Sequence, residues 1–467
     1  MGRTLFDKLW DMHAVADLGE GTSLLLVDRI LLHERTGGVA LESLADAGRA
    51  VADPRQVFVT MDHIVDTLPG RGDRTIMPTG TQFITATRRG ALDAGLTLFD
   101  IGDPRQGIVH VISPEQGIVL PGLSLVCPDS HTCTQGALGA LAWGIGSTEA
   151  EHALATATLR VRKPKTMRIT ITGRLGTGVT AKDLALHIVS HFGSAGASGH
   201  HLEYAGEAVR ALDVEARLTL CNMATELAAF SAIIAPDETV FSFLQGRTYA
   251  PTGTGWDDAV AFWRTLQSDD GAVFDSDHVI DAGAVSPMVS WGTSPQQAVA
   301  LGDPVPAFDA AAAGTRASHD RALTYMGLQP GDRLDTLPID AAFIGSCTNA
   351  RLSDLRRAAA ILRGHRVAAS VKAICVPGST AVKAAAEAEG LDRIFLDAGF
   401  EWREAGCSMC FFAGGESFGF RQRVITSTNR NFESRQGPET RSHLASPETV
   451  AASAIAGHIA DPRMVAA

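Results

Sequence analysis

The sequence of 467 residues lacks several features that would place it in a simple class of protein. It has no apolar run as long as the roughly 18 residues that a membrane-spanning helix needs. Its first residues show no basic start, apolar stretch and small-residue cleavage site, so a secretion signal is not expected. No Lys/Arg-rich run offsets the formal net charge of −12, which argues against nucleic acid as a general partner.

Aromatic residues are also scarce, at 6% of the chain, whereas glycine is abundant, with 47 residues. This balance is typical of α/β proteins, in which strands and helices are joined by many tight turns. The seven cysteines are odd in number and scattered, so they do not predict a disulfide framework. They favour a reducing compartment, and we expect a cytoplasmic protein.

Strand-like and helix-like patterns alternate along the chain, which predicts mainly parallel sheets with functional residues at the carboxyl ends of strands. Changes in composition and in the pattern of strand-like and helix-like runs divide the chain into three expected α/β domains, at residues 1–165, 166–325 and 326–467. Domains one and three have similar patterns of strand-like and helix-like runs, which suggests a shared sheet architecture. We expect helices at residues 5–13, 42–50, 180–191, 218–230 and 351–362, and strands at 24–30, 57–63, 108–112, 123–127, 167–172 and 339–344.

Three of the cysteines stand in two short motifs that suggest an inorganic centre. Cys347 lies in an expected strand-to-helix turn, where the helix dipole favours a thiolate. Cys407 and Cys410 form a C-x-x-C pair whose sulfurs can reach one metal centre. A [4Fe–4S] cluster used only for electron transfer normally has four cysteines, so a set of three leaves one iron open to substrate or water.

The three cysteines alone leave structural zinc and a redox pair open as alternatives. A thioredoxin-like site would place the pair at the start of a helix near the beginning of a βαβ pattern, which is not the case here. Structural zinc would need a fourth ligand, and no cysteine or histidine lies near Cys410 in the sequence.

Residues that can donate or accept protons lie at the carboxyl ends of two strand-like runs. Asp62 and His63 end one run, and a carboxylate that orients an imidazole provides a proton donor for a departing hydroxide. Asp129, Ser130 and His131 repeat the pattern with a hydroxyl added. Their surroundings do not form the G-x-S-x-G elbow of a nucleophilic serine, so covalent hydrolysis is disfavoured.

Other polar residues have ordinary structural explanations when each is taken alone. His110 would be a core histidine, and Asn222 and Glu226, at positions i and i+4, would form a polar stripe on one helix face. Arg430 and Arg435 lie on one loop, where two guanidinium groups can bind a dicarboxylate. The glycine-rich segment 136–146 lacks the spacing of a phosphate loop, so close packing is preferred to nucleotide binding.

The motifs Gly345–Asn349, Gly406–Cys410 and Ser427–Arg435 occur in that order along the chain. Together they resemble the aconitase superfamily of hydro-lyases and, within it, the isopropylmalate dehydratase branch. The resemblance implies three aconitase-type α/β domains around a [4Fe–4S] cleft. It also implies that the swivelling fourth domain, with its Gly-Ser-Ser-Arg motif, is a separate small subunit in a heterodimer or heterotetramer.

The resemblance assigns roles to individual residues. It implies that Cys347, Cys407 and Cys410 bind the cluster and that Asp62, His63, His110, Asp129, Ser130, His131 and Glu226 are catalytic. Asp129 would pair with His110, and Ser130 would bond the substrate. Asn222 and Glu226 would approach the cluster water and the substrate hydroxyl, Asn429 would lie in the cluster environment, and Arg430 and Arg435 would bind the carboxylates of a small dicarboxylate.

The implied reaction interconverts 2-isopropylmalate and 3-isopropylmalate by dehydration and rehydration, as in leucine biosynthesis. Four departures from the branch bear on the substrate: Phe411–Glu416 after the last cysteine, Gln135 for histidine, Ile64 for asparagine and Ser434 for glycine. A hydratase of citraconate, dimethylmaleate or another alkyl-substituted maleate is therefore an alternative. An iron-sensing RNA-binding protein and a zinc-stabilised structural protein are alternatives from other classes.

Overall fold

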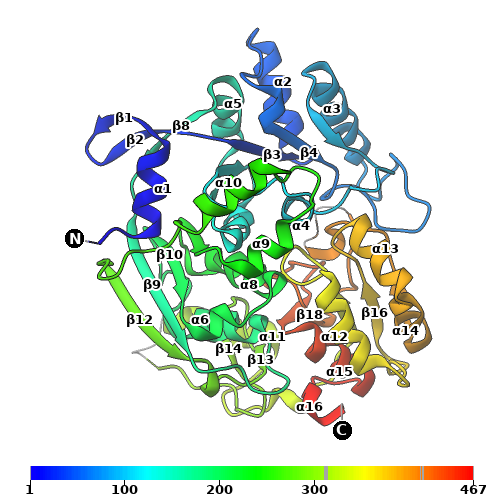
Figure 1. Ribbon diagram of the computed structural model, residues 1–467. Helices are drawn as coiled ribbons and strands as arrows, with labels where there is room; N and C mark the ends of the chain where they lie inside the picture. The colour runs from blue at the N-terminus through cyan, green and yellow to red at the C-terminus, as the bar shows by residue number, and fades with distance from the viewer. Residues whose placement is uncertain (1, 310–313, 411, 413–414, 466–467) are drawn as a thin grey trace. The chain divides into compact units, whose positions relative to one another are not determined.

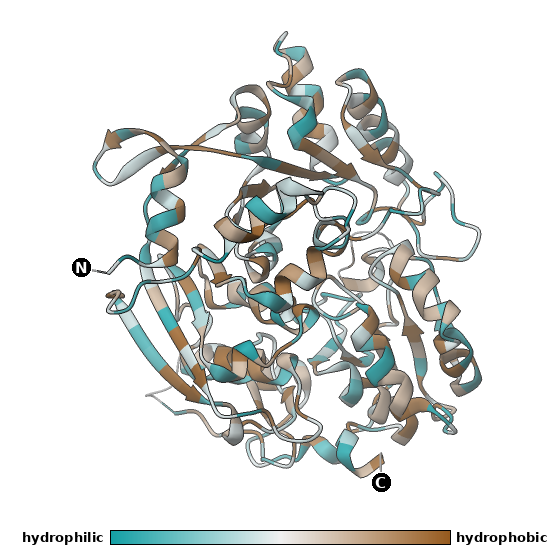
Figure 2. Cartoon of the chain, in the orientation of Figure 1, coloured by the Kyte–Doolittle hydropathy of each residue, from teal (hydrophilic) through white to brown (hydrophobic). Residues whose placement is uncertain are grey.

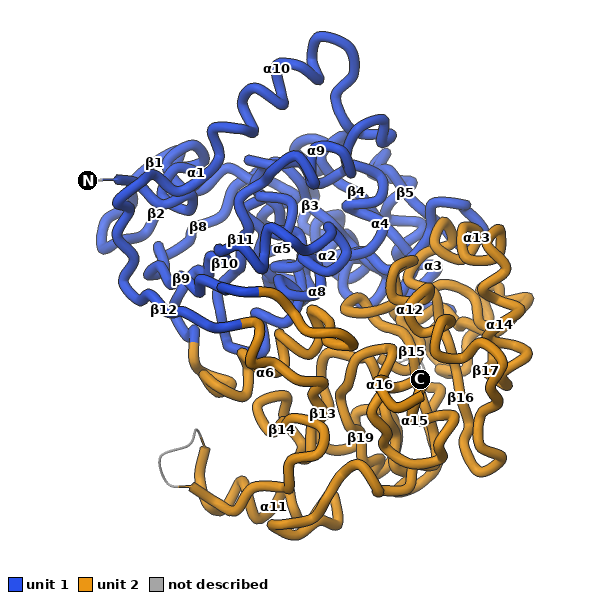
Figure 3. The backbone as a smooth tube through the Cα atoms, turned by 60° about the horizontal axis from the view of Figure 1, so that its bottom comes forward, with its two compact units in different colours: residues 1–62, 81–173, 197–281 blue, residues 63–80, 174–196, 282–467 orange. Residues whose placement is uncertain are grey.

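A computed structural model describes residues 2–309, 314–410, 412 and 415–465. Backbone contacts group the chain into two compact units, each built from several segments (Figure 3). Unit 1 contains residues 1–62, 81–173 and 197–281, and unit 2 contains residues 63–80, 174–196 and 282–467. The three domains expected from the sequence follow changes in composition, and that division stays a prediction.

Unit 1 contains a five-stranded parallel sheet with the order β5-β4-β3-β6-β7. Its strands are β3 (Arg29–His33), β4 (Val57–Thr60), β5 (Thr97–Phe99), β6 (Ser124–Cys127) and β7 (Leu141–Gly144). Every residue of β4 and β6 is buried, as expected for a parallel sheet covered on both faces. The strand order reverses between β3 and β6, and ligands of open α/β sheets bind outside the carboxyl ends at such a point.

Helices and two smaller sheets complete unit 1 (Figure 1). The smaller sheets are β1 (Ala14–Gly19), β2 (Thr22–Leu26) and β8 (Thr158–Arg162), which are antiparallel, and the parallel β9 (Lys165–Thr172), β10 (His200–Ala205), β11 (Ser231–Ile234) and β12 (Ser276–Asp281). The helices are α1 (Leu5–His13), α2 (Gly37–Asp46), α3 (Gly80–Asp93), α4 (Val109–Glu115), α5 (Ser147–Thr156), α7 (Glu207–Arg210), α8 (Val214–Asn222), α9 (Glu238–Leu244) and α10 (Thr254–Trp263), with 3₁₀ turns η1 (Pro54–Gln56), η2 (Ser130–Leu138) and η3 (Met223–Leu227).

Unit 2 repeats the strand order of the unit 1 sheet. Its five parallel strands have the order β17-β16-β15-β18-β19, so the architecture shared by the first and last parts of the chain is confirmed. These strands are β15 (Ala341–Ile344), β16 (Lys372–Cys375), β17 (Phe400–Trp402), β18 (Arg423–Thr426) and β19 (Arg441–Leu444). Figure 2 shows β16 in the colour of hydrophobic residues, and three of its four residues are buried.

The remaining elements of unit 2 are helices, a hairpin and short turns. They are α6 (Ala181–Phe192), α11 (Arg316–Met326), α12 (Leu352–Leu362), α13 (Thr380–Ala388), α14 (Leu391–Ala398), α15 (Pro447–Ala456), α16 (Pro462–Val465), the antiparallel pair β13 (Met288–Ser290) and β14 (Ala298–Ala300), and η4 (Ala282–Ala284), η5 (Leu334–Thr336) and η6 (Ser408–Cys410). Among the described residues, no helix is long and apolar enough to cross a membrane.

Most expected elements are confirmed, and the errors have physical causes. The helices at 5–13, 180–191 and 351–362 correspond to α1, α6 and α12, and Thr180 caps α6 together with Asp183 as expected. The strand expected at 108–112 is wrong, because this buried run forms α4 and a short apolar run does not distinguish the two states. The strand expected at 24–30 is divided between β2 and β3.

Close packing is confirmed for the glycine-rich segment 136–146. A Cβ atom on Gly136 would lie 1.7 Å from the backbone oxygen of Ala232, and one on Gly144 would lie 2.5 Å from that of Asp129. Both glycines therefore allow neighbouring backbone to approach closely.

Glu448, in the first turn of α15, gives unit 2 a pH-dependent stability. Burial raises the pKa of its carboxyl to about 7, although Arg357 lies 2.8 Å away and lowers it. Since this folded value exceeds the unfolded value of 4.5, the stabilising contribution is complete below the unfolded pKa and is lost as pH rises through the folded pKa.

We therefore expect Glu448→Gln to raise the free energy of unfolding at alkaline pH by about 1–3 kcal/mol, with little effect at acidic pH. Arg357 keeps Asp354 as a partner in the variant, at 2.8 Å. Urea denaturation between about pH 5 and pH 8 measures the difference. The half-exposed Glu439, which pairs with Arg421, provides the control, Glu439→Gln. A wild-type pH slope in Glu448→Gln would contradict the prediction.

Candidate functional site

The carboxyl edge of the unit 1 sheet carries most of the acid–base residues expected from the sequence. Asp62 follows β4, and the segment Asp129–His131 follows β6. Because carboxyl ends of parallel strands share one edge, these residues lie near the point where the strand order reverses. His33, which ends β3 there, was not selected from the sequence, although the same rule for strand ends identifies it.

Asp129 and His110 form the first acid–imidazole pair. His110 Nε2 lies 2.9 Å from Asp129 Oδ1, and both side chains are largely buried. The Gln135 amide lies 3.4 Å from His110 Nδ1 and can donate to it, which leaves the ring proton on Nε2, facing the carboxylate. Gln135, a departure from the expected histidine, thus contributes to fixing the imidazole tautomer.

His131 and Glu226 form a second pair in the same unit. His131 Nε2 lies 3.1 Å from Glu226 Oε1, and Ser130 Oγ lies 3.3 Å from the other ring nitrogen. Asp129 caps η2 by accepting the backbone N–H of His131 at 2.7 Å. This hydrogen bond brings the second pair next to the first.

Asn222 and Glu226 do not share one regular helix, so that part of the sequence interpretation is wrong. Helix α8 ends at Asn222, and Glu226 belongs to the tighter turn η3. Both side chains nevertheless face η2, since Asn222 Nδ2 donates to Thr134 Oγ1 at 2.8 Å. The packing of this helix end on η2 therefore fixes Glu226 beside His131.

Asp62 is completely buried and held by the backbone. Its Oδ2 accepts the N–H of Val109 at 2.8 Å, and its own N–H donates to Glu34 at 2.9 Å. His63, with which a segment of unit 2 begins, is also buried. The orientation of His63 by Asp62 stays a prediction.

The three motif cysteines belong to the carboxyl edge of the unit 2 sheet. Cys347 follows β15 and precedes α12, which confirms the expected strand-to-helix turn, and Cys407 and Cys410 follow β17. Asn429 follows β18, the strand on the other side of the reversal in strand order. All three thiols are buried, with at most 6% of the residue exposed.

The contacts of these thiols suit ligands of an iron–sulfur cluster, and the joint binding of one cluster by all three stays a prediction. Cys407 and Cys410 Sγ lie 2.9 Å apart, and Asn429 Nδ2 lies 3.4 Å from Cys347 Sγ, where it can donate to a thiolate. Arg351 donates to the backbone oxygens of Cys347 and Thr348, which orients the turn. Binding to separate irons requires the Cys407 and Cys410 sulfurs to move apart.

Each motif turn contains a serine with a positive φ angle. The values are 85° for Ser346, 49° for Ser408 and 62° for Ser434, a region that a residue with a Cβ adopts at a cost of about 1 kcal/mol or more. Ser434 therefore occupies a backbone position suited to the glycine that it replaces. Such local strain clusters at functional sites.

Three of the other four cysteines differ from the motif cysteines in their surroundings. Cys127, Cys221 and Cys375 are completely buried, and burial raises the pKa of each thiol well above its ordinary value. They are therefore poor sources of a thiolate.

The loop that carries the expected carboxylate-binding arginines is anchored by two residues missed in the sequence. Lys182, which is fully buried, donates to the backbone oxygens of Ser427 and Thr428 at 2.8 and 2.6 Å. Asn431 donates to Ser290 and to two backbone oxygens. No pattern in the sequence links these distant segments.

Arg430 and Arg435 are both partly exposed on this anchored loop. The Arg435 guanidinium lies 4.9 Å from the centre of the Phe432 ring. Stacking of this kind orients the guanidinium plane. Of the departures in the sequence, Phe411, Ala413 and Gly414 lie outside the described residues.

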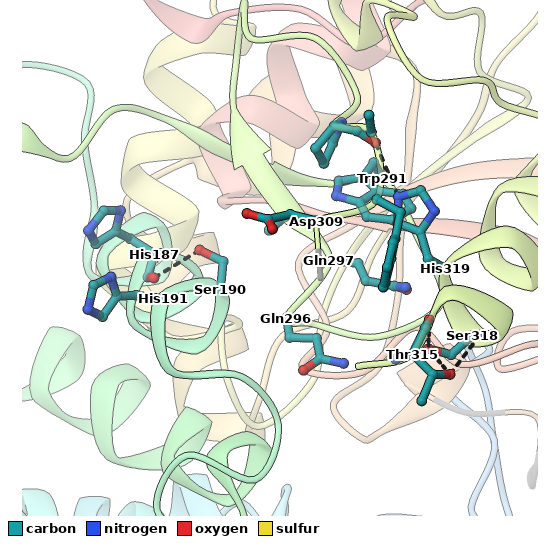
Figure 4. Close-up of a pocket in the computed structure, with 14 residues that line it drawn as sticks. His187, Ser190, His191, Trp291, Gln296, Gln297, Asp309, Thr315, Ser318 and His319 are labelled. Atoms are coloured by element: carbon teal, nitrogen blue, oxygen red, sulfur yellow. Dashed lines mark hydrogen bonds between the residues drawn. The ribbon is translucent and has the colours of Figure 1, made fainter. Parts of the chain in front are cut away.

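A cavity of about 400 Å³ lies elsewhere in unit 2 and contains none of the expected site residues. Figure 4 shows His187, Ser190 and His191 of α6 on one side and Gln297 and His319 on the other. The candidate residues of each unit are thus identified by their chemistry and by their place at the carboxyl edge of that unit's sheet.

Comparison with known proteins identifies the family of the chain and a relative of nearly the same length. Residues 7–457 match the aconitase family (aconitate hydratase). The 3-isopropylmalate dehydratase large subunit 1 of Bradyrhizobium diazoefficiens is 51% identical over 463 residues, which cover 99% of this chain and 97% of that protein.

Proposed function

Because the chain belongs to the aconitase family along almost its whole length, we propose that it is the large subunit of an enzyme that interconverts 2-isopropylmalate and 3-isopropylmalate. The enzyme is a hydro-lyase, which removes water from a hydroxy acid and adds it back. The isomerisation serves leucine biosynthesis. We place the enzyme in the cytoplasm, where seven reduced cysteines persist.

The observation that carries the proposal is the set of three buried thiols at the carboxyl edge of the unit 2 sheet. Cys347, Cys407 and Cys410 would hold a [4Fe–4S] cluster, and the Asn429 amide would donate to the Cys347 sulfur. When bound, such a cluster supplies an open iron that acts as a Lewis acid on the substrate hydroxyl and carboxylate. Arg430 and Arg435 would bind the substrate carboxylates.

The acid–base residues would supply the proton transfers. We assign protonation of the leaving hydroxide to His63, with Asp62 as the carboxylate that raises its basicity. Asp129 keeps the proton of His110 on Nε2, and Glu226 does the same for His131 through its contact with Nε2. Ser130 would donate a hydrogen bond to the substrate.

A small partner would complete the enzyme. The relative is named a large subunit, and we propose that this chain likewise pairs with a small subunit that supplies the swivelling domain. That partner would provide the base that removes the proton next to a carboxylate, together with further carboxylate binding.

The test is a substrate comparison with the cluster-loaded complex of this chain and its co-encoded small partner. We expect kcat/KM for the isopropylmalate isomers to exceed that for citraconate and dimethylmaleate by about tenfold or more, because an apolar pocket discriminates by single carbon groups on this scale. Anaerobic assays with each substrate, and iron and zinc determinations on the same sample, provide the measurement. Faster hydration of citraconate or dimethylmaleate would assign the enzyme to those substrates.

A further inference from the structure

His33 lies between the carboxylates of two of the acid–base residues. Its Nδ1 is 4.0 Å from Asp62 Oδ1, and its Nε2 is 3.9 Å from Asp129 Oδ2. The two ring nitrogens therefore face different acids. All three residues belong to unit 1, at the carboxyl ends of β3, β4 and β6.

His33 is buried next to three acidic residues, Glu34, Asp62 and Asp129. Glu34 and Asp62 are completely buried, His33 is 1% exposed, and the Asp129 side chain is 17% exposed. The nearest polar atoms of His33, Glu34 and Asp62 all lie within 4.8 Å of one another. Buried carboxylates require a compensating positive charge or several hydrogen-bond donors.

Other titratable groups face these acids from neighbouring elements. His110 of α4 pairs with Asp129 at 2.9 Å, and His131 of η2 lies 3.7 Å from the same carboxylate. On β6, burial raises the pKa of Cys127, and the charges of Asp129 and Asp62 raise it further. The negative potential of both carboxylates therefore extends through this region.

Hydrogen bonding favours a proton on Nε2 of His33, and the charge of Asp62 favours one on Nδ1. Thr36 Oγ1 lies 3.3 Å from the Pro128 oxygen, to which it donates, and 3.4 Å from His33 Nε2. A hydroxyl that donates its hydrogen to a carbonyl accepts from the imidazole, so Nε2 carries a proton. The Asp62 carboxylate, near Nδ1, favours a second proton there.

We propose that His33 is a positioning residue, held as an imidazolium between Asp62 and Asp129, that keeps both acids ionised and couples their protonation states. Its role rests on the proposed hydro-lyase reaction, because it acts through these two acids. His33 keeps its own protons and contributes no atom to the product.

The test compares His33→Gln, which keeps an N–H donor without the charge, with His33→Ala, in the large–small complex. We expect kcat near neutral pH to fall by about 10–100-fold, the scale for outer residues that orient reacting groups, with KM nearly unchanged. Loss of the positive charge raises the pKa of both acids, so the acidic limb of the kcat profile should move up by about one pH unit or more. Added imidazole should partly restore His33→Ala.

His201 provides a matched control, because it is a histidine of unit 1 that is also 1% exposed. Its ring stacks on Phe6, with the ring centres 4.3 Å apart. Burial lowers its pKa to about 3, so it is neutral, and His201→Gln should leave the acidic limb in place. An unshifted acidic limb in His33→Gln would overturn the proposal even if the rate falls.

A measurement that does not depend on catalysis distinguishes a failure of this proposal from a failure of the proposed function. Nitrogen NMR of the histidine-labelled chain, with His33→Gln for assignment, should show both ring nitrogens of His33 protonated at neutral pH. A neutral His33 ring overturns the proposal. A wild-type complex that does not interconvert isopropylmalates overturns the proposed function, while the NMR signal still decides the charge of His33.

Discussion

Replacing Cys347, Cys407 or Cys410 with serine is expected to abolish the iron–sulfur absorbance of the reconstituted chain and, with it, all measurable turnover. Thiolates are the ligands that iron–sulfur clusters require, and a serine hydroxyl remains protonated at neutral pH. Because the protein supplies only three proposed ligands, each replacement leaves the cluster with two. Visible absorbance and the iron and sulfide content per chain, measured anaerobically, provide the test.

Cys375 offers the closest control for these variants. It ends β16 in the same sheet of unit 2, is completely buried and has a pKa raised by that burial. Cys375→Ser and Cys127→Ser should therefore keep the full cluster content. A Cys407→Ser chain with wild-type iron and sulfide would refute the ligand assignment.

The second large effect concerns the small partner. The cluster-loaded chain alone should show almost no turnover, because we assign the proton-abstracting base and part of the carboxylate binding to the partner. The loss of positioned acid–base groups costs roughly 10²–10⁴-fold, and lost orientation costs more. Titration with the co-encoded small protein should restore activity with a saturable dependence on its concentration.

His63→Ala separates catalysis from assembly in the same titration. Since the proposed role of His63 is proton delivery, the variant should saturate at the wild-type partner concentration but reach a much lower maximal rate. The two-subunit proposal would be refuted if the isolated chain isomerised isopropylmalate as fast as the mixture does.

Local chemistry allowed much of the site to be predicted from the sequence. The cysteine motifs and the ends of β4 and β6 are marked by short patterns, and a strand end is where an α/β sheet places functional residues. The same rule would have found His33, which ends β3. His33 lies outside the strand expected at 24–30, which ends three residues before β3 does.

Long-range contacts could not be predicted in this way. Helix α4 was expected to be a strand because Ile108–Ile112 is β-branched, and tertiary burial overrode that local preference. Gln135 was recognised as a departure, but its contact with His110 depends on the fold of η2 against α4. Lys182 and Asn431 have no local pattern at all, since their partners are backbone oxygens far away in the sequence.

The buried ammonium of Lys182 also bears on when the proposed metal centre could form during biosynthesis. Lys182 donates to the backbone oxygens of Ser427 and Thr428, residues 245 and 246 positions later in the chain. At a translation rate of about 5–20 residues per second, these partners emerge roughly 12–50 seconds after Lys182. Until then the Lys182 ammonium cannot reach these two acceptors and is hydrated by water. The turn that carries Asn429 is therefore fixed only near the end of synthesis. A cluster held by Cys347, Cys407 and Cys410 would consequently be assembled on a nearly finished polypeptide.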